Sequence, residues 1–154
     1  MRLMVPFIGY FWISLMYSLV SLAFLIPFDR FNGRIGFFLY WILNWTTQMS
    51  LGYVLEFVLL WRGPMVLPFF LFFWIIVNVS VIFLDISNMD RVFMYGFLMP
   101  IWNNVDGTKS LIFGTKDHLA QNFGVILSWA VCGMAAVTSL VGARRACQQR
   151  SASD

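Results

Sequence analysis

The chain has 154 residues, of which 60% are hydrophobic and only 11% are charged. Soluble domains carry about 25% charged residues, so this composition indicates an integral membrane protein whose main partner is the lipid bilayer. The formal net charge of +3 is small and its basic residues form no stripe, which argues against a nucleic-acid partner.

Four apolar runs are each about long enough to cross a bilayer as a helix, which takes about 20 residues. They cover residues 4–28, 35–61, 65–84 and 121–141. The first run could be mistaken for a secretory signal, but signal cores span only about 7–15 residues and end at a small-residue cleavage site. This run is longer and ends at Pro27-Phe28-Asp29. We therefore expect an anchor that stays in the protein.

Residues 85–119, between the third and fourth runs, form the only long polar stretch. Apolar residues recur there at spacings of three and four on both sides of Pro100. That spacing is typical of amphipathic helices, and a proline breaks a helix. We expect a hairpin of two short amphipathic helices at the membrane interface, broken at Pro100. The alternative is a helical plug against the bundle with no role of its own.

The second apolar run carries a slanting polar stripe. Asn44, Gln48, Gly52 and Glu56 recur there every four residues, and Asn78 is a further amide in the third run. Polar groups within a membrane usually face a partner helix or a wet cavity. One interpretation is a lined pathway that contacts a polar substrate. The other is hydrogen bonding between helices, with Gly52 allowing a close approach.

The fourth run presents small residues on one face, namely Ser128, Cys132 and Ala136. Small residues let membrane helices pack closely, so a second copy or another membrane protein is a candidate partner. Residues 142–154 are a polar tail that we expect to be disordered. Four spans place both termini on the same side. The basic residues divide five and five between the two sides, and their density near the termini favours a cytoplasmic location for both.

No enzymatic, cofactor or metal site is predicted. His118 is the single histidine and has no histidine or cysteine partner at metal-binding spacing. The segments Gly107-Thr108-Lys109-Ser110 and Gly114-Thr115-Lys116 resemble phosphate-binding loops but lack the full spacing and the preceding strand. Gly114 is explained more simply as the glycine that ends a helix.

Several short segments resemble, in the same order, the fungal nitrosoguanidine-resistance membrane protein family. The resemblance covers about residues 8–135. The segments that carry it are Phe11-Trp12-Ile13-Ser14-Leu15, Gly36-Phe37 with Tyr40-Trp41, Leu51-Gly52 with Leu55-Glu56, Phe73-Trp74-Ile75-Ile76-Val77-Asn78, Tyr95-Gly96 with Met99-Pro100, Ile112-Phe113-Gly114-Thr115-Lys116, and Asn122-Phe123-Gly124-Val125 with Trp129.

Members of that family look like relatives of the permease half of type-2 ABC exporters. The resemblance implies a fold like the C-terminal part of such a permease, with four transmembrane helices and an extracellular hairpin before the last. It also implies a plasma-membrane location and cytoplasmic termini. The family tends to have a proline where Asp85 stands and an arginine where Lys109 stands. Lysine keeps the charge of arginine but loses its planar fork.

The leading hypothesis is a transporter-like membrane protein, a shortened permease domain that affects drug or mutagen resistance or lipid distribution. Polar contacts within the bundle would come from Asn44, Gln48, Glu56 and Asn78. Within the hairpin, the residues of interest are Pro100, Lys109, Gly114 and Lys116. The alternatives are a non-transporting scaffold or regulator of another membrane protein, and a degenerate remnant.

Overall fold

The computed structural model describes residues 4–24, 26, 35–83, 91–114 and 118–151, and every regular element within these ranges is helical. The α-helices are α1 (Met4–Ala23), α3 (Ile35–Arg62), α4 (Leu67–Val79), α5 (Pro100–Phe113) and α6 (Leu119–Ser151), and the 3-10 helix is η2 (Arg91–Leu98).

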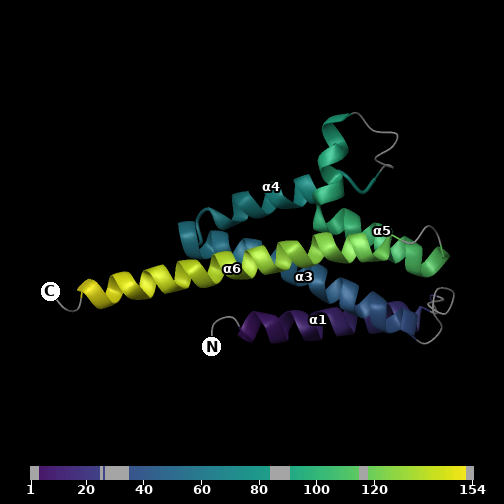
Figure 1. Cartoon of the computed structure of the whole chain (residues 1–154), viewed down its shortest axis with the longest axis horizontal. Helices are drawn as coiled ribbons and strands as arrows, with labels where there is room; N and C mark the ends of the chain where they lie inside the picture. The colour runs from purple at the N-terminus through teal and green to yellow at the C-terminus, as the bar shows by residue number, and fades with distance from the viewer. Residues whose placement is uncertain (1–3, 25, 27–34, 84–90, 115–117, 152–154) are drawn as a thin grey trace.

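Helix α3 is the centre of the bundle and contacts α1, α4, α5 and α6 (Figure 1). The short helix α4 lies beside the C-terminal half of α3, and α5 lies beside its N-terminal half. The start of α1 and the end of α6 point toward the same end of the bundle (Figure 1). The two termini of the helical bundle therefore lie on one side.

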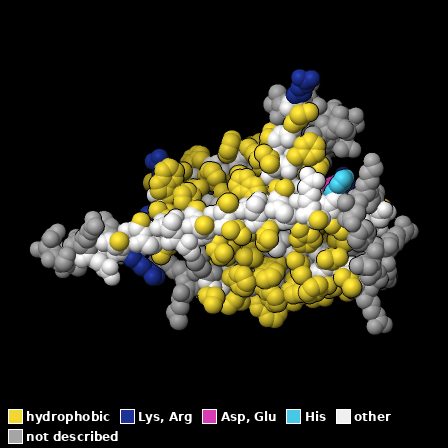
Figure 2. Space-filling view, in the orientation of Figure 1, with side chains coloured by type: hydrophobic (Ala, Val, Ile, Leu, Met, Phe, Trp, Pro, Cys, Tyr) yellow, Lys and Arg dark blue, Asp and Glu magenta, His cyan; other side chains and the backbone are white. Residues whose placement is uncertain are grey.

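The buried apolar cluster lies where α3, α5 and α6 meet. Leu43, Leu111 and Ile126 are fully buried there, with Tyr40 and Leu119 beside them. Many other large apolar side chains point outward, and Figure 2 shows apolar side chains covering much of the visible face. Such a surface is unfavourable in water and is what a lipid-facing surface requires.

Two of the described helices are long and apolar enough to cross a membrane, namely α1 (Met4–Ala23) and the Leu119–Ala146 part of α6. The prediction of four transmembrane helices, and with it the permease-like fold, is therefore wrong. Helix α4 has 13 residues and a length of about 20 Å, whereas the apolar core of a bilayer is about 30 Å thick. Helix α3 is long enough, but its polar stripe dilutes its apolar character.

The predicted disorder of the tail is wrong for residues 142–151, because α6 continues as a helix as far as Ser151, and residues 152–154 lie outside the described residues. The third predicted run is shortened at both ends, since its helix begins at Leu67 and ends at Val79.

The polar stretch forms two short helices on either side of Pro100, although the first, η2, is a 3-10 helix. The chain is extended at Met99, and Pro100 begins α5, where proline costs little. At the other end, Gly114 has a φ of 64°, a left-handed conformation that favours glycine. The buried Asn103 side chain donates to the carbonyls of Phe97 (2.9 Å) and Met99 (2.8 Å). The Asn103 side chain thereby joins the end of η2 to the start of α5, where the Met99 carbonyl also accepts from the Asn103 backbone N–H at 3.3 Å.

Hydrogen bonds between side chains and other elements fix the position of this hairpin. The hydroxyls of Tyr95 in η2 and Ser80 after α4 share a hydrogen bond of 2.9 Å. The indole N–H of Trp129 in α6 donates to the Leu98 carbonyl at 2.7 Å. These bonds hold the start of α5 against the bundle, so that α5 runs along α3.

Candidate functional site

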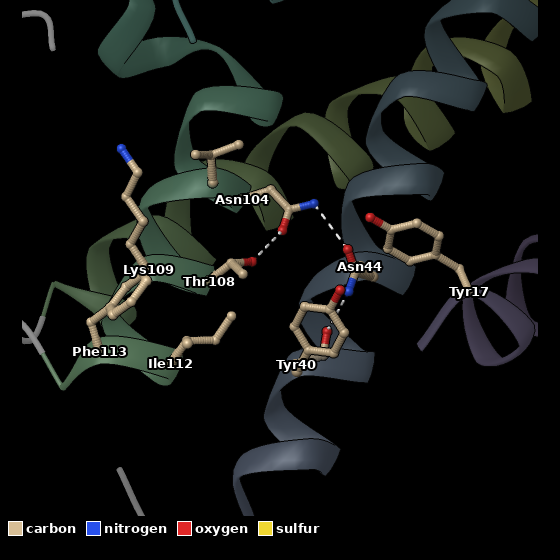
Figure 3. A pocket seen from close by; sticks show the side chains of 9 residues that line it. Tyr17, Tyr40, Asn44, Asn104, Thr108, Lys109, Ile112 and Phe113 are labelled. Carbon is tan, nitrogen blue, oxygen red and sulfur yellow. Dashed lines mark hydrogen bonds between the residues drawn. The ribbon is translucent and has the colours of Figure 1, made fainter. Parts of the chain in front are cut away.

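An open cavity of about 220 Å³ lies between α1, α3 and α5 (Figure 3). Its wall combines hydroxyl and amide groups with one amino group and several apolar side chains. The lining residues are Tyr17, Tyr40, Asn44, Asn104, Val105, Thr108, Lys109, Ile112 and Phe113.

A chain of polar groups links α3 to α5 along one wall of this cavity. Asn44 is buried, and its amide nitrogen donates to the Tyr40 carbonyl at 3.0 Å. Its side-chain oxygen accepts from the Asn104 amide at 3.2 Å, and the Asn104 oxygen accepts from the Thr108 hydroxyl at 3.3 Å (Figure 3). This chain is a preformed polar surface in a largely apolar protein.

Two tyrosines extend the polar wall toward α1. The Tyr40 hydroxyl shares a hydrogen bond of 3.1 Å with the Ser21 hydroxyl, which ties α3 to α1. Figure 3 shows the Tyr17 hydroxyl directed toward the side of the cavity formed by Asn44. The Tyr17 residue as a whole is 55% exposed.

Among the described residues that line the cavity, Lys109 is the only charged one. Its side chain is exposed, and Figure 3 shows its amino group extending away from Asn44 and Tyr17. The nearby carboxylate of Asp106 is turned toward α6, where it accepts from the Asn122 amide at 2.8 Å. No described acidic residue forms an ion pair with Lys109. The charge that the described residues place at the mouth of the cavity is therefore positive.

Helix α5 can approach α3 closely because residue 107 is glycine. A Cβ at Gly107 would lie 2.9 Å from a methyl carbon of Leu43, which is shorter than normal contact. The close contact at Gly107 lies between Asn104 and Lys109 in sequence. It therefore sets how near the polar wall of α5 lies to α3.

The structure brings together only some of the residues that the sequence analysis selected. Asn44 and Lys109 line the cavity. The side-chain oxygen of Gln48 is buried without a hydrogen-bond partner among the described residues. Glu56 follows two turns further along α3, outside the cavity lining, and Asn78 is buried on α4 with its amide donating to the Trp74 carbonyl.

Of the described hairpin residues that the sequence analysis selected, Lys109 lines the cavity and the others do not. Pro100 and Gly114 lie at the two ends of α5 and shape the helix rather than the cavity. Lys116 lies outside the described residues. The hydroxyls of Thr47 and Ser50, which flank the stripe, donate to backbone carbonyls of their own helix. Among the described residues, Asn44 is the stripe residue for which a hydrogen bond to the hairpin is seen, with Asn104.

Four polar lining residues did not stand out in the sequence, namely Tyr17, Tyr40, Asn104 and Thr108. Two signals could have found three of them. Tyr40 lies one helical turn before Asn44, so the four-residue stripe could have been extended back to it. Asn104 and Thr108 are also four residues apart, on one face of a helix. Tyr17 carries no such signal, because its place depends on how α1 packs.

The described residues contain no group of three or more histidine, cysteine, aspartate or glutamate side chains placed to hold a metal ion. The cavity instead offers hydrogen-bond donors and one cation, beside apolar side chains. Together with the two candidate spans and the outward-facing apolar residues, it defines an integral membrane protein with a small polar site between helices.

The chain belongs to the family described as protein of unknown function DUF3533, whose profile matches residues 1–135. An uncharacterised endoplasmic reticulum membrane protein of Saccharomyces cerevisiae is 25% identical to it over 131 residues. That match covers 82% of this chain and 26% of the relative, so this chain spans about a quarter of the relative's length. No solved structure matches the chain.

Proposed function

We propose that this chain is a transporter-like membrane protein that binds a phospholipid headgroup in the cavity between α1, α3 and α5 and thereby influences lipid distribution. The observation that carries the proposal is the composition of the cavity wall. Asn44 and Asn104 offer a polar surface, whereas Ile112 and Phe113 are apolar. Phe113 is 65% exposed, so an acyl chain that leaves the cavity would meet an apolar surface at once. An amphipathic ligand suits both parts.

The size of the cavity favours a headgroup over a complete drug molecule. Pockets that enclose drug-sized ligands measure about 300–1,000 Å³. The cavity here measures about 220 Å³ and is open on one side. A phospholipid needs only its headgroup enclosed, because its acyl chains remain in the bilayer. The drug or mutagen resistance expected from the family resemblance would then be an indirect effect of altered lipid distribution.

The arrangement of the short helices supports a transporter-like role. Helices α4 and α5 each follow about half of α3, and η2, which lies between them in sequence, projects from the bundle (Figure 1). In transporters, substrate sites often lie beside helices interrupted in this way, because the interruption exposes polar groups at membrane depth. The cavity here is next to α5, with its polar wall on the bundle side of that helix.

The proposal predicts that filling the cavity abolishes lipid redistribution. Thr108 faces the cavity, so Thr108→Phe should block headgroup entry while changing a single side chain. Thr138 on α6 is exposed and bonds only its own helix, so Thr138→Phe is the matched control. The measurement is the rate at which a fluorescent phospholipid in vesicles becomes accessible to a membrane-impermeant quencher. We expect wild type and Thr138→Phe to accelerate it equally, and Thr108→Phe to match protein-free vesicles.

Two outcomes contradict this proposal. If wild-type vesicles redistribute lipid no faster than protein-free vesicles, the chain is no lipid transporter. If Thr108→Phe redistributes lipid like wild type and is equally well inserted, the cavity is not the route. Either result would favour the alternative that the chain is a non-transporting scaffold or regulator of another membrane protein. That alternative draws support from the exposed small residues of α6, Ser128, Cys132 and Ser139, which suit a helix of a partner protein or second copy.

We further propose that the protein resides in the endoplasmic reticulum rather than in the plasma membrane, with both termini cytoplasmic. The name of the yeast relative supports the location. The orientation is supported by the arginines at one end of the bundle. Arg144 donates to the carbonyl of Leu60, two residues before Arg62, and Arg145 follows it. Basic residues gather on the cytoplasmic side of membrane proteins.

Location and orientation are tested together with a fluorescent tag at either terminus. We expect both fusions to overlap an endoplasmic reticulum marker and both tags to be digested when protease is added to intact microsomes. Fluorescence at the cell outline would contradict the location. A tag that survives protease until detergent is added would contradict the orientation.

A further inference from the structure

We propose that the cavity selects phospholipids with a net negative headgroup, such as phosphatidylserine, and that Lys109 is the residue that makes this selection. This inference rests on the proposed function and adds the class of lipid to it. Zwitterionic and anionic phospholipids share the phosphate, so the choice between them depends on the other charges in the cavity.

Of the charged residues on the described elements around the cavity, the one in the cavity lining is a cation, which favours an anionic ligand. Helix α1 carries no charged residue between Met4 and Ala23. Helix α3 carries Glu56 and Arg62, both far along the helix from Asn44. Helix α5 carries Asp106, which is bonded to Asn122 of α6 and does not line the cavity. Among the described residues, Lys109 is therefore the charge that a bound headgroup meets.

The neutral groups of the wall also suit a phosphate or carboxylate. Hydroxyl and amide groups donate hydrogen bonds to anionic oxygens, and the Tyr17 hydroxyl is directed toward the polar wall (Figure 3). A choline group, in contrast, carries a permanent positive charge. It is bound by carboxylates or by the faces of several aromatic rings. None of the described lining residues carries a carboxylate, and the ammonium group of Lys109 would repel choline at the mouth.

The position of Lys109 along α5 suits a contact with a phospholipid headgroup at the membrane interface. It lies in the last turn and a half of α5, near the end of the bundle where α6 begins. A lysine at that position can extend its amino group to the membrane interface while its stem covers apolar surface. The phosphate region of a phospholipid lies at the same interface, with its acyl chains toward the apolar surface beside Phe113.

The test compares lipids and variants on the full chain purified in detergent micelles. Phosphatidylserine or phosphatidylcholine is added, and retained lipid is counted by native mass spectrometry. The variants are Lys109→Gln, Lys109→Arg and Arg145→Gln. Arg145 is an exposed cation at the opposite end of the bundle, so its variant removes the same charge without touching the cavity. A third probe, inorganic phosphate, is added in competition with phosphatidylserine.

We expect wild type to prefer phosphatidylserine and Lys109→Gln to lower that preference about fivefold, the effect of one basic residue near a membrane surface. Lys109→Arg and Arg145→Gln should keep the preference, and inorganic phosphate should not displace the lipid. Three results overturn the inference: equal binding of both lipids by wild type, equal losses in Lys109→Gln and Arg145→Gln, or displacement by phosphate alone. Equal binding would leave the proposed function standing. Binding of neither lipid would refute the proposed function as well.

Discussion

At the scale of single residues, glycines determine how closely the helices pack. A Cβ added at Gly52 of α3 would overlap the ring of Tyr10 in α1, and a Cβ added at Gly133 of α6 would lie 2.9 Å from the Cβ of Tyr53. Tyr10 and Tyr53 also meet edge to face, with ring centroids 6.2 Å apart. The glycines therefore allow aromatic side chains to fill the space between α1, α3 and α6.

Gly52→Ala should destabilise the protein by about 1–3 kcal/mol, because the added methyl group must displace Tyr10 from a packed position. The control is Gly124→Ala on α6, where nothing lies within 4 Å of the new methyl group. That variant should be as stable as wild type or more stable, by roughly 0.5–1 kcal/mol, because alanine favours a helix. Thermal unfolding in detergent, followed by circular dichroism, measures both. Equal stability of the two variants would show that Tyr10 moves away freely.

The hydrogen bonds of individual residues also limit which parts of the polar stripe are free to contact a ligand. Its hydroxyl neighbours are largely satisfied within their own helix, since Thr46 and Thr47 donate to the carbonyls of Ile42 and Leu43. Asn44 differs, because it bonds both its own helix and Asn104 of α5. Asn44 therefore fits both interpretations of the stripe. It forms a hydrogen bond between two helices, and it is also part of the wall of a cavity.

At the scale of elements, the hairpin helix α5 connects the fold to the site. The sequence predicted a break at Pro100, and the structure has it there, because a proline at the first turn and a glycine after the last are local signals. The partner of α5 could not be predicted in the same way. Asn44 and Asn104 are 60 residues apart in sequence, and nothing in either segment specifies that they meet.

Helix α4 shows a second limit of the sequence pattern. Apolar residues continue to Leu84, which suggested a full span, but the helix ends at Val79 and a turn follows. Hydrophobicity alone does not distinguish a spanning helix from a short one that continues as an apolar turn. The position of Ser80 explains part of the ending, because its hydroxyl bonds the Val77 carbonyl and Tyr95 of η2. The hairpin therefore holds the chain at this turn.

At the scale of the whole molecule, an apolar exterior surrounds the helix that carries the polar wall of the cavity. Helices α1 and α6 present apolar surface to lipid, whereas α3 is enclosed by the other helices and carries the polar wall. Composition alone predicted the membrane location, because a soluble domain of this size carries a larger share of charged residues. The number of spans needed the structure, since it depends on helix ends and on what surrounds α3.

The central claim is that a phospholipid headgroup occupies the cavity between α1, α3 and α5. The most direct measurement is photolabelling of the membrane-inserted protein with a phospholipid that carries a photoactivatable group on its headgroup, followed by peptide mapping of the adducts. If the headgroup binds in the cavity, we expect adducts on cavity residues, above all Tyr17 and Phe113, and the loss of these adducts in Thr108→Phe. Adducts confined to the outer face of α4, at Phe69 and Phe72, would contradict it, because they would show lipid meeting only the exterior of the bundle.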